Sequence, residues 1–159
     1  SSDVCSSDLL EHLTMTLPVS YSTEKNEEYC ILSYTKLNLY TYGFVAIKGR
    51  NGANGNIYGN KNGGDGMAAI RCSMLEVHRA DNLLITGGNG GIAASGTRIT
   101  DNGGKAGSGA VAIILVFTNN PPILCENVEV YGGCSGDNKT CMNGWYNIPP
   151  TVTPPHLKN

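Results

Sequence analysis

The sequence predicts an all-β fold built from an imperfect glycine-rich repeat, on the basis of two observations. First, three segments of alternating apolar residues end in glycine; they begin at Val45, Leu83 and Val128 and are spaced by 38 and 45 residues. Second, 17 of the 21 glycines lie between Gly43 and Gly109. Alternating β-branched and apolar residues bounded by Gly, Asn, Asp and Pro are typical of strands, and helix signals are weak throughout the repeat.

The N-terminal region is expected to lie outside the repeat. Residues 1–9, SSDVCSSDL, resemble the in-frame translation of a common sequencing adapter, so the chain is expected to be a metagenomic fragment and this segment is excluded from fold reasoning. Without Asp3 and Asp8 the net charge of −2 becomes zero, which leaves no electrostatic argument for a nucleic-acid or membrane partner. Residues 10–28 form a poorly defined segment, with at most a short helix over residues 9–13.

The glycine-rich β-repeat domain is expected to span residues 29–137. Its first part, residues 29–47, predicts two strands. A second element then repeats: NGGDGMAAI, ending at Ile70, matches NGGKAGSGAVAI, ending at Ile113, 43 residues later. The unit is therefore a glycine loop, an Ala-Ile strand, a turn, a second strand and another glycine loop, in about two and a half copies.

Within the glycine loops, Gly recurs at every third residue, as at Gly49, Gly52 and Gly55 and again at Gly104 and Gly107. Three-residue spacing is typical of a polyproline-II-type helix, in which a glycine face lets neighbouring backbones approach closely. Two alternatives stay open, namely flexible or irregular surface loops and packed glycine-rich helices. In either case, hydrogen bonds are expected from the intervening asparagines, Asn51, Asn54, Asn60, Asn62 and Asn89.

Five cysteines lie outside the adapter-like segment, and the sequence leaves their pairing open: Cys30, Cys72, Cys125, Cys134 and Cys141. Cys134 and Cys141 bracket the loop SGDNKT, which a disulfide could close, and this spacing indicates an oxidising compartment. Cys72 is expected to be a buried free thiol. Residues 138–159 form a Cys/Pro-rich tail and linker, whose paired prolines predict an extended chain.

Residues 30–137 resemble glycine-rich repeat proteins of the parallel β-helix or autotransporter-passenger kind, in which strands ending in GG.GG alternate with GxAI strands. The resemblance implies a short glycine-rich β-solenoid with irregular or polyglycine-II-like loops. Ile47, Ile85 and Val130 would then form one interior ladder, and the two Ala-Ile strands another. It also implies an adhesin-like, structural or adhesive function, in a secreted or cell-surface protein that presents a polar binding face to glycan or protein partners.

The segment LLITGGNGGIA, which begins at residue 83, also resembles the cofactor turn of short-chain dehydrogenases, T-G-x-x-x-G-I-G. The matching residues are Thr86, Gly87, Gly91 and Ile92, and the resemblance implies an NAD(P) pyrophosphate bound by backbone amides at the start of a helix. A truncated NAD(P)-binding domain is therefore one alternative function.

Three features of the surrounding sequence disfavour the dehydrogenase alternative. The required helix would contain Gly96 and Gly103, each of which costs a helix about 1 kcal/mol. The acidic residue expected about 20 positions on is replaced by KAGSG, residues 105–109. The family's Tyr-x-x-x-Lys pair occurs only as YSTEK, residues 21–25, ahead of the glycine motif, whereas it should follow it.

The sequence favours a non-enzymatic function, and no catalytic, metal or cofactor residue is assigned. On a carbohydrate-active β-helix, the other alternative, the polar cluster would be Glu76, His78 and Arg79, but alternation with Leu75 and Val77 places Glu76 and His78 together on the solvent side. No apolar run approaches the roughly 20 residues of a membrane span. Three aspartates have a spacing that fits neither an EF-hand nor the nonapeptide calcium repeat: Asp65, Asp101 and Asp137.

Overall fold

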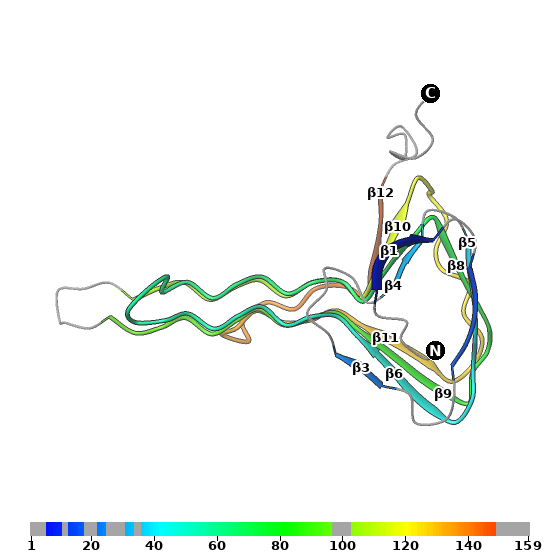
Figure 1. The fold of residues 1–159 in the computed structure, drawn as a ribbon, viewed down its shortest axis with the longest axis horizontal. Helices are drawn as coiled ribbons and strands as arrows, with labels where there is room; N and C mark the ends of the chain where they lie inside the picture. Colours follow the sequence, from blue (N-terminus) through cyan, green and yellow to red (C-terminus); the bar gives the residue numbers. More distant parts are fainter. Residues whose placement is uncertain are drawn as a thin grey trace.

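Every element that the computed structural model describes is a strand, which confirms the predicted all-β character (Figure 1). The residues described in full are 36–96 and 103–148, and the backbone alone is described for 6–10, 13–17, 22–24 and 31–33. The strands in chain order are β1 (Ser6–Leu10), β2 (Leu13–Leu17), β3 (Ser22–Glu24), β4 (Ile31–Ser33), β5 (Lys36–Thr41), β6 (Phe44–Lys48), β7 (Ile70–Cys72), β8 (Met74–Arg79), β9 (Asn82–Thr86), β10 (Ile113–Val116), β11 (Val128–Tyr131) and β12 (Trp145–Ile148).

The strands form three separate parallel sheets. The first sheet has the order β1-β4-β7-β10-β12, the second β11-β9-β6-β3 and the third β2-β5-β8. From β1 to β9 the chain visits the first, third and second sheets in turn, and after β10 it passes to β11 in the second sheet and β12 in the first. Each strand therefore pairs with its counterpart one repeat later and not with its neighbour along the chain, as in the pairs β6 with β9 and β7 with β10.

Apolar residues at alternate strand positions build the core between the sheets. Ile47 pairs with Ile85, and Ile85 pairs with Val130, so the predicted interior ladder is confirmed. Ile70 pairs with Ile113, which confirms the second ladder. All four isoleucines are fully buried. Each buried side chain of this size contributes about 1.5–3 kcal/mol, so these ladders hold the strands in register.

The predicted β-solenoid is wrong. The described strands lie in three separate short sheets, and no closed solenoid is found among them. The glycine segments explain the difference, because residues 49–69, 87–96 and 103–112 leave the sheets and pack against each other, as Figure 1 shows. These segments carry few apolar side chains to bury at a core, whereas their backbone groups satisfy one another.

Three local predictions also differ from the structure. The short helix over residues 9–13 is wrong, because β1, which lies largely in the adapter-like segment, and β2 both pair as strands. Residues 29–47 hold three strands where two were predicted, since the chain turns at Gly43, which adopts a φ of 67° that glycine tolerates without steric cost. The predicted Ala-Ile strand that reaches Ile70 does not continue as one strand through residues 70–79. It divides at Ser73 into β7 and β8, which belong to different sheets.

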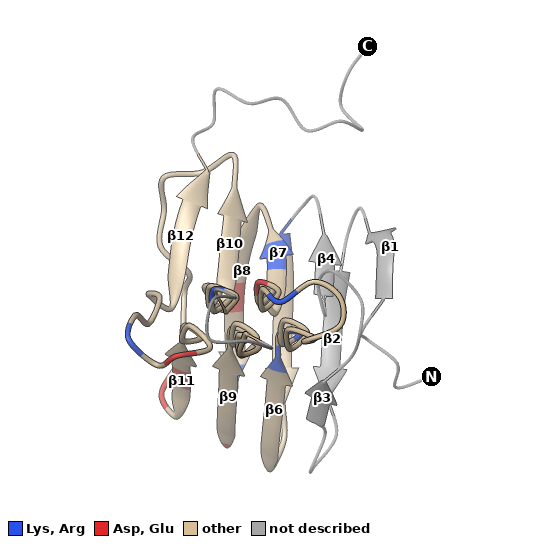
Figure 2. Cartoon of the chain, turned by 90° about the vertical axis from the view of Figure 1, so that its left-hand side faces the viewer, with Lys and Arg blue, Asp and Glu red and all other residues tan. Residues whose placement is uncertain are grey.

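The glycine segments form an arm that projects from the sheets (Figure 1). We call residues 49–69, 87–112 and 132–144 the arm, of which residues 97–102 lie outside the described part of the chain. Each segment runs out from the second sheet and returns to the first. The outgoing chains form one layer and the returning chains the other, and Figure 2 looks along the arm onto these two rows.

Backbone hydrogen bonds join the chains of the arm at three-residue steps. In the outgoing layer, Gly49, Gly52 and Gly55 each donate an N–H to a carbonyl of the parallel neighbour, at 2.7–2.8 Å. In the returning layer, Gly63 and Gly66 do the same at 2.8 Å. Antiparallel bonds with the same period connect the layers, from Gly88 to Met67, from Gly91 to Gly64 and from Ala94 to Lys61.

Glycine is needed in the arm for space and not for backbone conformation. A Cβ atom on Gly63 would lie 2.0 Å from the carbonyl oxygen of Gly91, and one on Gly91 would lie 1.9 Å from that of Ala53. Among the described glycines, only Gly43 has a positive φ. Of the two alternatives for these segments, the structure therefore shows the packed one, in which a polyproline-II-like period brings backbones into direct contact.

Replacement of Gly91 by Ala is expected to destabilise the protein by about 2–3 kcal/mol, because the new methyl must push two backbones apart. Gly59→Ala is the matched control, since the atom nearest to its Cβ is 3.9 Å away. We expect this control to leave stability unchanged or to raise it by about 0.5 kcal/mol. Urea unfolding of both variants checks the prediction, and equal effects at the two positions would contradict it.

Candidate binding surface on the glycine arm

The outgoing layer carries a row of asparagines on its outer face. Asn51, Asn54 and Asn89 each precede or follow a packed glycine. The three-residue period therefore directs their side chains toward solvent. Each side-chain oxygen accepts a backbone N–H from the chain one repeat later, at 2.9, 3.0 and 2.9 Å respectively. Because only the oxygen of a carboxamide can accept from an N–H, the NH2 group of each side chain is directed away from that amide.

The predicted asparagine hydrogen bonds are confirmed on the returning layer as well. Asn62 accepts the N–H of Lys105, and Asp65 accepts that of Ser108, both at 2.9 Å. Asn60 accepts the N–H of Asn62 at 3.1 Å, within the turn at the end of the first segment. These side-chain oxygens thus accept backbone N–H groups that a further chain would otherwise bind. Asp65 shows that a carboxylate oxygen accepts such a bond as well as a carboxamide oxygen does.

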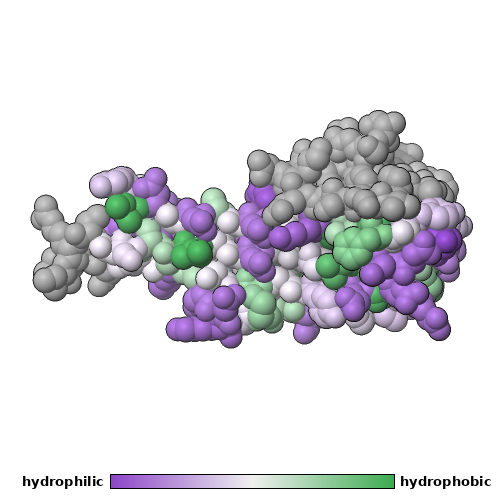
Figure 3. Space-filling view, turned by 90° about the horizontal axis from the view of Figure 1, so that it is seen from below, coloured by the Kyte–Doolittle hydropathy of each residue, from purple (hydrophilic) through white to green (hydrophobic). Residues whose placement is uncertain are grey.

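A shallow hollow of about 250 Å³ follows the asparagine row. We call it the asparagine groove, and its lining includes Asn51, Asn54, Asn89, Ile92 and Asn138. None of its lining side chains is charged, and Ile92, which is 60% exposed, provides an apolar surface. Seen from below, the arm is largely hydrophilic with small hydrophobic patches (Figure 3). The groove therefore offers fixed hydrogen-bond donors beside an apolar contact.

The residues of the dehydrogenase-like motif do not form a phosphate cradle. Thr86 ends β9, and Gly87, Gly91 and Ile92 continue into the second outgoing chain. A pyrophosphate would need free N–H groups here, but all six from Gly87 to Ile92 donate within the chain. Their acceptors are the carbonyls of Tyr131, Met67, Cys134 and Gly64 and the side chains of Asn51 and Asn54. The residues described after Gly91, as far as residue 96, form no helix.

Glu76, His78 and Arg79 lie along β8 as expected, with their polar groups toward solvent and paired with neighbours. The Glu76 carboxylate contacts Nζ of Lys36 at 2.5 Å and Nε2 of His78 at 3.2 Å. The His78 ring stacks on Tyr40, with ring centroids 5.0 Å apart. Such pairs between adjacent strands stabilise a sheet surface, so the cluster is accounted for by the pairing of β5 with β8.

The cysteine pairing that the sequence left open is decided for two residues: Cys134 and Cys141 form a disulfide, and their Cα atoms lie 3.9 Å apart. Cys72 is a buried free thiol, as predicted, and its burial raises the thiol pKa to about 12. Cys125 is also free and is half-buried. Cys30 lies outside the described residues.

Asp137 organises the turn of the third glycine segment. Its carboxylate accepts the Ser135 hydroxyl at 2.6 Å and the Lys139 N–H at 3.1 Å, and these bonds lower its pKa. Asp101 lies outside the described residues. Within the described ranges, no group of three or more His, Cys, Asp or Glu side chains is placed to hold a metal ion. Nor does this part of the chain contain a helix long and apolar enough to cross a membrane.

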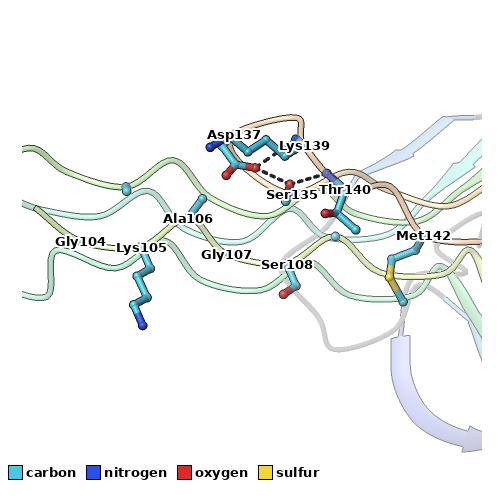
Figure 4. Close-up of a pocket in the computed structure, with 12 residues that line it drawn as sticks. Gly104, Lys105, Ala106, Gly107, Ser108, Ser135, Asp137, Lys139, Thr140 and Met142 are labelled. Carbon is cyan, nitrogen blue, oxygen red and sulfur yellow. Dashed lines mark hydrogen bonds between the residues drawn. The ribbon is translucent and has the colours of Figure 1, made fainter.

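A second hollow, which no sequence pattern predicted, lies where the third glycine segment turns back at Asp137. Its volume is about 590 Å³, and Ala93, Ala106 and Gly109 are among the residues that line it (Figure 4). We call these three residues the step. The signal in the sequence is the length of the third segment, which is shorter than the first two.

Acid is expected to weaken the ion pairs of β8. The hydrogen bond from Lys36, together with the charge of His78, lowers the Glu76 pKa below its ordinary value of 4.5. A lowered carboxyl pKa stabilises the fold above the ordinary value, and this contribution disappears as the pH falls through the folded-state pKa. Glu76→Gln should therefore be less stable than the parent at neutral pH and equal to it in strong acid. Thermal unfolding at both pH values checks this, and a pH-independent difference would contradict it.

Loss of the disulfide is expected to destabilise the turn of the third segment. For a loop this short, the double variant Cys134→Ser with Cys141→Ser should lose about 2–3 kcal/mol, mainly because the unfolded chain gains freedom. Urea unfolding with and without reductant tests the prediction. Reductant should lower the stability of the parent and leave the double variant unchanged. An effect of reductant on both would show that the loss of stability does not come from this disulfide.

No protein-family model matches the chain, and neither a curated protein nor a solved structure matches it. The two candidate surfaces, the asparagine groove and the step, are therefore defined by their geometry.

Proposed function

We propose that this chain is a structural or adhesive part of a secreted or cell-surface protein, and that its arm binds neutral glycans in the asparagine groove. The observation that carries the proposal is the fixed row of carboxamides. Asn51, Asn54 and Asn89 each have the oxygen held by a backbone N–H, so their NH2 groups are aligned before any ligand arrives.

Preorganised donors suit a sugar ligand for two reasons. Side chains that are already immobile lose little conformational freedom on binding, which removes one of the main costs of association. At a rise of about 3.1 Å per residue, residues three apart on one chain lie about 9 Å apart, so a row of side chains with this period can contact successive sugar units. The exposed surface of Ile92 adds an apolar contact for a sugar ring, and the uncharged lining suits a neutral ligand.

The disulfide supports a location outside the cytosol. Disulfides persist in oxidising compartments and are rare in reducing ones. The bond between Cys134 and Cys141 closes the turn that borders the groove at Asn138. An arm held together by backbone hydrogen bonds and closed by a disulfide suits a structural or adhesive role at a surface.

The double variant Asn54→Asp with Asn89→Asp tests the proposal. A carboxylate keeps the acceptor oxygen, as Asp65 does, but removes the NH2 donors. We expect thermal stability close to that of the parent and a loss of binding to immobilised neutral glycans of at least about tenfold, since two hydrogen bonds are removed.

Asn62→Asp is the matched control, because it makes the same change on the opposite layer and should bind like the parent. Absence of glycan binding by the parent would contradict the proposal. So would equal losses in the double variant and the control.

A further inference from the structure

The backbone of the second outgoing chain, residues 87–96, indicates an unfilled place beside the arm. Because the hydrogen bonds repeat every third residue, residues three apart face the same neighbour. Gly87 and Gly90 donate to the third outgoing chain, both at 2.9 Å. Ala93 is next in this series, and its N–H has no acceptor among the residues that the structure describes.

The second returning chain, residues 103–112, shows the same pattern. Ala112 donates its N–H to the carbonyl of Gly144, in the third returning chain, at 2.9 Å. Gly109 and Ala106 precede it by three and six residues and so face the same side, yet neither N–H has an acceptor in the described ranges. Both residues are half-buried. Both residues line the hollow, so an added chain there would supply the acceptors that these two N–H groups lack among the described residues.

The third glycine segment is held in a form that cannot fill this place. Ser135 donates its N–H to the carbonyl of Thr140 at 2.7 Å, which closes a tight turn. Asn138 adopts a φ of 58° within this turn. The disulfide between Cys134 and Cys141 lies at its base. The third segment therefore leaves the hollow beside the step unfilled beyond this turn. Figure 4 shows Ala106 and the turn residue Ser135 among the residues that line this hollow.

We propose that the step binds an extended glycine-rich segment of a partner chain, which continues the line of the third returning chain. Its carbonyl groups would accept the N–H groups of Ala106 and Gly109, which lie about 9 Å apart at the rise of such a chain. This is the same pairing that Gly63 and Gly66 make with the second returning chain. The partner needs acceptor carbonyls at every third residue.

The arm also defines which side chains the partner can carry. In the second returning chain, the acceptors Lys105 and Ser108 each follow a glycine, Gly104 and Gly107. A Cβ on either glycine would lie 1.9 Å from a carbonyl oxygen of the first returning chain. A partner in the equivalent position therefore needs glycine before each acceptor residue.

The third outgoing chain already lies along one side of the second returning chain. A Cβ on Gly109 would lie 2.2 Å from the carbonyl oxygen of Gly133, and three residues later Gly136 donates its N–H to the carbonyl of Gly107 at 3.0 Å. The outgoing line is therefore filled as far as Gly136. The returning line remains for the partner.

The test uses the peptide GGKAGSGA, the arm's own residues 103–110, as the probe in an amide NMR titration of the whole protein. We expect the N–H signals of Ala106 and Gly109 to shift. Ala106→Pro removes one donor while keeping the extended conformation, and should weaken binding at least about tenfold without loss of stability. Ala106→Gly keeps the donor and should bind like the parent.

A second peptide, with Val at the positions of Gly104 and Gly107, is the control and should not bind. Shifts confined to residues away from the step would overturn the proposal. Equal binding of the two peptides, or unchanged binding by Ala106→Pro, would do the same. Absence of any shift at millimolar peptide would also count against it.

Discussion

Direct contact between glycine Cα atoms and the carbonyl groups of neighbouring chains is the constraint on which the rest of this structure depends. At Gly52, Gly63 and Gly107, a single added carbon would lie 1.9–2.0 Å from a carbonyl oxygen. Side chains are thereby confined to the positions that face solvent. The arm consequently has almost no apolar core, and its cohesion comes from backbone hydrogen bonds, each worth about 1 kcal/mol net.

The sheets supply the register that the arm follows. Ile47 and Ile85 are paired across the second sheet at an offset of 38 residues, and Asn51 and Asn89 are linked at the same offset in the outgoing layer. The first sheet pairs Ile70 with Ile113 at an offset of 43, which recurs in the bond from Lys105 to Asn62. The hydrophobic ladders thus decide which amide meets which acceptor in the arm. The two offsets differ because the second glycine segment, residues 87–112, is longer than the first, residues 49–69.

The same packing rule produces two surfaces with different chemistry. Where a chain faces solvent, asparagine or aspartate oxygens satisfy the outward N–H groups and leave a smooth polar face, as at Asn54. Where a neighbouring chain ends early, as beside Ala106, the N–H groups are left without an acceptor in the described residues. The first surface presents donors on side chains and the second presents them on the backbone. A ligand of the asparagine groove and an added chain at the step would therefore be recognised independently.

The amino-acid sequence by itself determined the all-β character, the pairing of the repeated strands and the three-residue glycine period, because apolar alternation and glycine spacing are local and read directly from the chain. The pairing of Ile47 with Ile85 and the burial of Cys72 follow from such patterns, whereas the disulfide partner of Cys134 was left open by the sequence. Only the tertiary structure decided against a solenoid, since the sequence does not say whether a glycine segment closes a turn or packs on its own kind. It also decided that the amides from Gly87 to Ile92 are occupied, whereas those of Ala93, Ala106 and Gly109 have no acceptor among the described residues. An N–H group is free or bound according to the length of a neighbouring segment far along the chain, and that is a property of the assembled arm.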